Sequence, residues 1–296
     1  MRRIIAAAVL SSPVAWAALT TDVRALIAQH QLAAAANEVR AIQSRRGPSG
    51  EVAEALSWLA RGSLAERRLS EADAYANEAR SMAVRILGMR RIDSDPFLPT
   101  AVGASIEVHA SVLAAHGART EAVAFLEQQR NTWKGTSLAE RIQKNINLLG
   151  LEGKPAPALE GVDRASLKGH PVLLFFWAHW CPDCKADVPV IAEARKRFAP
   201  QGLVVIGPTR LYGYVAGGDP APAAVETKYI EQVRRQYYVP LQGMPAPLSA
   251  ANFESYGAST TPTIVLLDRA GVVRFYHPGA VAWPELSAKI EQVLRK

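Results

Sequence analysis

The chain has 296 residues, which is long enough for two domains, each able to bury a core. Apolar residues make up 49% and charged residues 21%, which excludes a disordered chain and a polytopic membrane protein. Lys and Arg number 34 against 27 Asp and Glu, a net charge of +7. No basic run is long enough to follow a phosphate backbone, so we expect no nucleic-acid partner. Two cysteines in all exclude a disulfide scaffold and a four-cysteine zinc site.

The first seventeen residues are typical of an export signal. A short basic start at Met1–Arg3 precedes the apolar stretch Ile4–Leu10, and Ala15–Ala17 ends in a small-x-small cleavage pattern. A buried first helix or an uncleaved anchor are the alternatives, but the apolar stretch is too short to cross a bilayer core of about 30 Å. No later segment approaches eighteen consecutive apolar residues. We therefore predict a signal peptide at 1–17 and a soluble exported protein, periplasmic or otherwise extracytoplasmic.

Residues 18–150 are expected to form an all-α domain. The segment is rich in alanine, and its apolar residues recur at helical spacing between breaks such as Arg46–Pro48 and Asp93–Pro99. This pattern predicts six or seven helices in antiparallel pairs. Three helix starts, near Gln31, Leu69 and Arg119, look alike and resemble degenerate tetratricopeptide-type hairpins, although their spacing is irregular. A plain helical bundle is an equal alternative, and such a domain could bind a partner protein.

The pattern changes after Gly153, and residues 151–296 are expected to form an α/β domain. Four strand-like runs alternate with helical stretches, which favours a sheet with parallel crossovers. The turn at Asp268–Gly271 predicts that the last two strands form an antiparallel hairpin. The expected strands are 172–177, 203–206, 263–267 and 272–276, and the expected helices are 184–198, 225–237, 252–256 and 283–294.

Both cysteines lie between a predicted buried strand and a predicted helix, in a C-x-x-C motif. A structural disulfide would close too short a loop to stabilise the fold. A zinc site would need two further ligands, and the histidines are scattered, so we expect no metal. Inert core cysteines are not expected at a strand-to-helix turn. Redox catalysis is the interpretation that remains.

The types of residue at this turn suit thiol chemistry. Cys181 is expected at the helix N-terminus, where free backbone N–H groups stabilise a thiolate, and Pro182 suits the first helical position. Cys184 follows one turn later and can reach the sulfur of Cys181. Cys181 would attack a substrate disulfide, and Cys184 would resolve the mixed disulfide.

The motifs Trp177–Cys184, Asp187–Pro189 and Thr260–Thr263 resemble the thioredoxin superfamily, in particular exported proteins of the TlpA/ResA/DsbE type. The resemblance covers about half of the chain. It implies a thioredoxin-like domain with a central mixed sheet, in which Pro262 is a cis-proline that faces the cysteine pair. It also implies that the backbone of Thr261 pairs with the bound substrate chain.

The resemblance suggests a role for one carboxylate. Asp187 stands where the exported relatives usually carry Glu, which tunes the thiol pKa values and relays a proton to the resolving thiol. Asp187, whose side chain is shorter than that of Glu, is the candidate for that role, and a solvated helix residue is the alternative.

Three neighbours of the cysteines are candidates for tuning or binding. Asp183 is expected to disfavour a thiolate on Cys181 and so to set a reducing potential near that of thioredoxin, about −270 mV, unless it points into solvent. His179 could donate a hydrogen bond to sulfur or substrate, but we expect a variable position on the rim of the site. Trp180 is expected to cover the thiols and offer an apolar face to substrate.

The sequence thus predicts an exported thiol–disulfide oxidoreductase that reduces protein disulfides, with oxidation or isomerisation of disulfides as the alternatives. We expect no cofactor beyond the cysteine pair. Its electrons would come from a membrane thiol-transfer protein. The client is open: an apocytochrome during cytochrome c maturation, a damaged exported protein or a partner oxidoreductase. The alternative is a helical-repeat adaptor whose thioredoxin-like half senses redox state. The segment 211–220 is expected to be a flexible loop with aromatic tips that either recognises partners or is inert.

Overall fold

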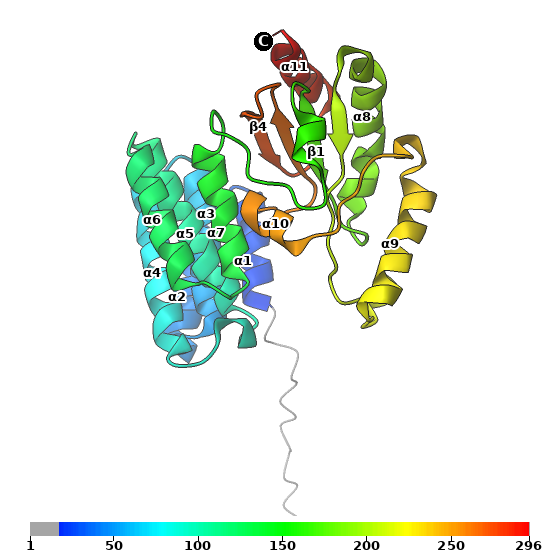
Figure 1. Ribbon diagram of the computed structural model, residues 1–296. Coiled ribbons are helices and arrows are strands. Elements are labelled where there is room, and N and C mark those ends of the chain that lie inside the picture. Colours follow the sequence, from blue (N-terminus) through cyan, green and yellow to red (C-terminus); the bar gives the residue numbers. More distant parts are fainter. Residues whose placement is uncertain (1–17, 296) are drawn as a thin grey trace, which may run out of the picture. The chain divides into compact units, whose positions relative to one another are not determined.

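The computed structural model describes residues 18–295, so the predicted signal peptide lies outside the described residues. The chain divides after Gly117 into two compact units. Figure 1 labels the helices and strands named below. Helices between residues 18 and 150 are α1 (Ala18–Ala28), α2 (Leu32–Arg46), α3 (Gly50–Ala65), α4 (Leu69–Leu87), α5 (Leu98–Ala115), α6 (Arg119–Thr132) and α7 (Leu138–Gly150). Seven helices in this described part confirm the prediction of a helical N-terminal half.

The first unit contains α1 to α5, and its core depends on small side chains. Ala60 of α3 and Ala72 and Ala76 of α4 pack with Val108 and Val112 of α5 in one buried cluster. Alanine at these positions leaves room for the helix backbones to approach closely. Among the described helices, α5 alone is long and apolar enough to cross a membrane, and 56% of that stretch is buried inside the protein, as in the core helix of a soluble protein.

The three helix starts that look alike in sequence share one backbone conformation. His30, Arg67 and Gly117 have φ values of 59°, 60° and 85°, and each stands two residues before the first residue of α2, α4 or α6. A left-handed residue at this place turns the chain sharply between consecutive helices. The similarity of these segments to tetratricopeptide hairpins beyond this shared turn stays a prediction.

The second unit contains α6, α7 and an α/β domain. Its further elements are β1 (Val172–Phe176), α8 (Pro182–Phe198), β2 (Val204–Ile206), α9 (Ala223–Tyr237), α10 (Ala250–Tyr256), β3 (Thr263–Leu267), β4 (Val273–Pro278) and α11 (Trp283–Leu294). Four described strands form one sheet in the order β2-β1-β3-β4. β1 runs parallel to β2 and antiparallel to β3, and β3 and β4 form the predicted antiparallel hairpin. The expected mixed sheet is therefore confirmed.

The two faces of the sheet carry separate cores, because strand side chains alternate between faces. Leu173 and Phe175 of β1 point into a core to which α8 and α11 contribute. Leu174 and Phe176 point into the other, where Phe253 and Tyr256 of α10 pack. All five residues of β1 are buried, which explains its continuous apolar sequence.

Helices α6 and α7 belong to the unit that holds the sheet, whereas the sequence placed the domain boundary at 150. α7 packs on α10 and β4 as well as on α6. The contact with α10 is so close that a Cβ on Gly257 would lie 2.3 Å from the backbone nitrogen of Lys144. The change in composition near 150 marks where strand-forming residues begin, and the packing changes earlier, after Gly117.

Candidate functional site

The cysteine pair lies where β1 passes into α8. Cys181 and Cys184 form a disulfide with Cα atoms 5.3 Å apart, and both residues are buried. Cys181 is the N-cap of α8, and its Sγ accepts the backbone N–H of Cys184 at 3.0 Å. Pro182 occupies the first helical position, where the absent N–H leaves no helical hydrogen bond unmade. An N–H aimed at the sulfur would stabilise a thiolate on Cys181 once the disulfide is reduced.

The segment before β3 lies against the sulfur of Cys181. The carbonyl oxygen of Thr261 is 3.4 Å from Cys181 Sγ. The Thr261–Pro262 peptide bond is cis, and Pro262 is buried. The structure thus brings together the cysteine motif and the Thr-Pro motif, which lie about eighty residues apart in sequence. A chain that binds beside Thr261 would carry its own sulfur next to Cys181.

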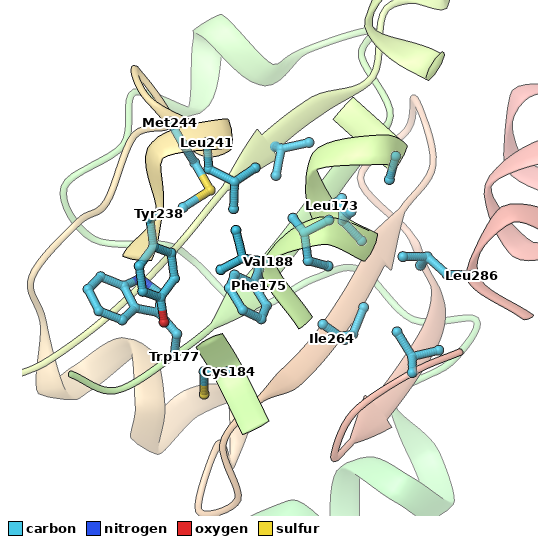
Figure 2. Packing of buried hydrophobic residues seen from close by; sticks show 14 of the residues in the cluster. Leu173, Phe175, Trp177, Cys184, Val188, Tyr238, Leu241, Met244, Ile264 and Leu286 are labelled. Carbon is cyan, nitrogen blue, oxygen red and sulfur yellow. The ribbon is translucent and has the colours of Figure 1, made fainter. Parts of the chain in front are cut away.

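Aromatic side chains support the cysteines from the core. Figure 2 shows Trp177 and Tyr238 beside one another above Cys184. Their ring centroids are 4.5 Å apart, and Nε1 of Trp177 donates a hydrogen bond to the carbonyl oxygen of Gly207 at 2.9 Å. This hydrogen bond joins the end of β1 to the end of β2. It therefore fixes the start of the turn that carries the cysteines. A rigid turn keeps the two sulfurs within reach of one another.

Asp187 is buried on α8, one turn after Cys184. Burial raises the pKa of this carboxyl above its usual range, the backbone N–H of Val281 partly offsets that shift, and the charge of Asp183 adds to it. Its Oδ2 has no hydrogen-bond partner among the described residues. The solvated position considered as the alternative is therefore wrong. A buried carboxylate with a raised pKa is a stronger proton acceptor than an exposed one.

His179 is buried, and the expectation of a rim position is wrong. Only 1% of the residue is exposed, because the rings of Tyr212, Tyr214 and Tyr229 surround the imidazole edge-on at 5.4 to 5.6 Å. Its Nε2 lies 3.1 Å from Oε1 of Glu226. Burial lowers the pKa of His179, although the hydrogen bond to Glu226 opposes that shift.

Trp180, Pro182 and Asp183 form the exposed margin of the site. Trp180 is 45% exposed, and its ring meets the ring of Tyr212 edge-on at 5.5 Å. Asp183 is exposed to solvent. Its predicted tuning of the potential stays a prediction. The role of Trp180 as an apolar face for substrate stays a prediction too.

Sequence reasoning missed two polar residues near this margin. Glu226, in the first turn of α9, is fully buried and accepts backbone hydrogen bonds from Tyr212 and Gly213. Arg210 lies over the ring of Tyr212 and donates to Glu140 of α7 at 2.6 Å. Neither residue belongs to a motif, and only the folded chain brings them to the site. The one available signal was the acidic residue in the first turn of a predicted helix.

The 211–220 segment, expected to be a flexible loop, contains local structure. Tyr214 and Pro220 form an isolated antiparallel bridge, and Ala216–Gly218 is a short 3₁₀ turn. Tyr212 and Tyr214 are half-buried around His179, so they are not exposed tips.

A mixed sheet with a buried strand that leads into a C-x-x-C helix start, opposite a cis Thr-Pro bond, defines a thioredoxin-like domain. Residues 160–294 match the family described as "Thioredoxin-like domain". The C-terminal half of the chain therefore holds a thioredoxin-like domain, as the resemblance implied.

Individual relatives carry thiol–disulfide names. "Thiol:disulfide interchange protein DsbE" of Pseudomonas aeruginosa is 29% identical over 156 residues, which are 49% of this chain and 77% of that protein. The protein of the same name from Yersinia pestis is 32% identical over 139 residues, 44% of this chain and 65% of its own length. The crystal structure of a putative DsbE from Chlorobium tepidum, 22% identical, covers 48% of this chain and 97% of its own, with a TM-score of 0.39.

Proposed function

We propose that the chain is an exported thiol–disulfide oxidoreductase that reduces disulfides in other proteins through Cys181 and Cys184. The observation that carries the proposal is the disulfide at the N-terminus of α8, with its first sulfur beside the backbone of Thr261. Oxidoreductase activity is also supported by the names of the DsbE relatives.

The reaction begins with the reduced pair. The thiolate of Cys181 attacks one sulfur of a substrate disulfide, which breaks the substrate S–S bond, forms a mixed disulfide and releases one substrate thiolate that takes a proton. Pairing of the substrate backbone with Thr261 and contact with Trp180 would hold the mixed disulfide in place.

Cys184 then completes the transfer of two electrons. Asp187 accepts the proton of the Cys184 thiol, and the resulting thiolate attacks Cys181 Sγ. The second substrate thiolate leaves, so the substrate is reduced and the chain carries the disulfide seen in the structure. A further thiol donor must reduce this disulfide, and outside the cytoplasm a membrane thiol-transfer protein would supply the electrons. No cofactor beyond the cysteine pair is required.

Export is part of the same proposal. The N-terminal pattern supports it, and so does a 72-residue stretch 35% identical to a Mycobacterium bovis protein named "Soluble secreted antigen MPT53". Cleavage after Ala17 would give a mature chain that begins at Ala18. Clients then include apocytochromes during cytochrome c maturation and damaged exported proteins.

The experiment is insulin reduction by the full chain with dithiothreitol as donor, together with the redox potential of the pair. We expect a potential near about −270 mV, Cys181→Ser to abolish turnover, and Cys184→Ser to accumulate a mixed disulfide with insulin. Equal rates for the wild-type chain and Cys181→Ser would exclude the enzyme and favour an adaptor. A potential near about −120 mV would instead indicate an oxidant.

A further inference from the structure

Glu226 occupies an unusual position for a carboxylate. The residue is fully buried, and no Lys or Arg pairs with it among the described residues. Its Oε1 accepts the backbone N–H of Tyr212 at 2.6 Å, and its Oε2 accepts that of Gly213 at 2.8 Å. Burying a charged group costs free energy unless hydrogen bonds satisfy it. In this protein, the two backbone hydrogen bonds to the Glu226 side chain fix the turn of the chain at Tyr212 and Gly213.

That turn determines where two aromatic rings lie. The ring of Tyr212 is 5.6 Å from the imidazole of His179 and 5.5 Å from the ring of Trp180. His179 completes the arrangement, because its Nε2 is 3.1 Å from the same carboxylate. Glu226 thus ties the segment after β2 to the two residues that stand directly before Cys181.

Trp180 is the member of this group that meets solvent. It is 45% exposed and adjacent in sequence to Cys181, whereas His179 is buried. An exposed indole beside a reactive sulfur is a contact surface for a polypeptide, since aromatic side chains carry much of the binding free energy in protein interfaces. A small disulfide that reaches only the sulfur does not need this surface.

We propose that Glu226 is a positioning residue that fixes Trp180 through Tyr212, and thereby sets the preference of the cysteine pair for protein disulfides over small disulfides. The inference rests on the proposed function and adds to it the residue that determines substrate class. The partner it fits is an extended apolar segment next to a disulfide.

The test compares two second-order rate constants of the reduced full chain, one with insulin and one with hydroxyethyl disulfide. Glu226→Gln keeps the size of the side chain but replaces one acceptor with an amide donor, so the N–H of Tyr212 or Gly213 loses its partner. A buried N–H without a partner costs free energy, which favours displacement of the turn. We therefore expect the ratio of the insulin rate constant to the small-disulfide rate constant to fall about fivefold or more. Glu231→Gln, on the exposed face of α9 where Glu231 pairs with Arg234 at 2.9 Å, is the matched control and should leave the ratio unchanged.

A double-mutant cycle decides whether Glu226 acts through Trp180. Trp180→Ala alone should lower the ratio, and Glu226→Gln should lower it by less than about twofold further in that background, because the two changes share one effect. Tyr212→Leu removes the ring contact but keeps the backbone N–H on Glu226, and it should lower the ratio like Glu226→Gln. This variant also decides the matter if Glu226→Gln does not fold.

The outcomes separate the two proposals. An unchanged ratio in Glu226→Gln or in a folded Tyr212→Leu, or an undiminished effect of Glu226→Gln in the Trp180→Ala background, overturns the role of Glu226 and leaves the oxidoreductase proposal intact. A wild-type chain that reacts with neither disulfide overturns both.

Discussion

At the scale of single residues, the burial of Asp187 has two consequences that can be measured apart. The carboxyl lies on the same helix as the resolving cysteine, and its pKa is raised because burial disfavours the charged form. The raised pKa brings the carboxyl closer to the pKa of a thiol, which favours proton transfer between them. The same burial means that ionised Asp187 destabilises the folded chain.

The first consequence concerns the rate. We expect Asp187→Asn to slow resolution of the mixed disulfide by about 100-fold, the lower range for loss of a positioned proton acceptor. Rapid-quench trapping of the mixed disulfide measures this step directly. Glu193→Gln, at an exposed carboxylate further along the same helix, is the control and should resolve at nearly the wild-type rate.

The second consequence concerns stability against pH. The folded chain holds the Asp187 proton more tightly than the unfolded chain, whose pKa is about 3.9. The stability tied to this proton is complete below that value and is lost as pH rises through the folded pKa. The Asn in Asp187→Asn does not titrate. The free energy of unfolding of the variant should therefore rise relative to that of the wild type as pH rises through this range. Urea unfolding from pH 3 to 8 measures the difference, and a difference that does not vary with pH would contradict the assignment.

The positions of site residues were predictable where they depend on local sequence. The motif alone placed Cys181, Cys184 and Pro182, because a strand, a turn and a helix start follow each other along the chain. The burial of His179 was not predictable, since it depends on tyrosines and on Glu226, which return to it from a distant segment. The local sequence around His179 does not indicate these long-range contacts.

At the scale of elements, the shared turn before α2, α4 and α6 carries a cost in two of its three copies. A non-glycine residue in the left-handed region is unfavourable by about 1 kcal/mol or more, and His30 and Arg67 occupy it. Gly117 occupies it without this cost. The three segments therefore share a backbone conformation, which explains why their side-chain patterns look only loosely alike.

We expect Arg67→Gly to stabilise the first unit by about 1 kcal/mol and Gly117→Ala to destabilise its turn by a similar amount. Arg67 is exposed, and nothing lies within 4 Å of a Cβ on Gly117, so neither change alters packing. Hydrogen exchange of peptides from α3 and α4 in increasing denaturant measures the effect of the first change. A loss of protection in Arg67→Gly would show that the Arg67 side chain does more than occupy the turn.

Most elements were predictable because their apolar periods are clear. The strands and helices of the sheet unit agree with their expected positions within a few residues. The assignment of α6 and α7 to a packing unit was not predictable. Apolar residues at helical spacing show that one face of a helix is buried, but they do not show which element covers that face. Gly257, which lets α7 approach α10, is an ordinary helix-ending glycine in the sequence.

At the scale of the whole molecule, the division after Gly117 predicts where the chain can be cut. Residues 118–296 should unfold cooperatively on their own and keep the reaction with small disulfides. Residues 151–296 lack α7, including the buried Leu138 and Ile142 and the Glu140–Arg210 ion pair. We expect this shorter fragment to be less stable by at least about 3 kcal/mol, the burial free energy of two aliphatic side chains.

Urea unfolding of both fragments, followed by tryptophan fluorescence, measures the difference. Equal midpoints would place the boundary at 150, as the composition suggested. A single substitution in the longer fragment tests the same packing of α7. Gly257→Ala should lower its stability as well, since the added Cβ would collide with the backbone of α7.

The packing of α7 on α10 and β4 also bears on the order of synthesis. Domains fold as units while the chain is made, beginning with the N-terminal one. The first unit can finish once its last helix has been made, whereas α7 is made early and receives its partners in α10 and β4 only when those elements have been made. The side chains of α7 that face α10 and β4 therefore stay uncovered through the synthesis of more than a hundred residues. This interval is when a holding chaperone would matter most to the chain.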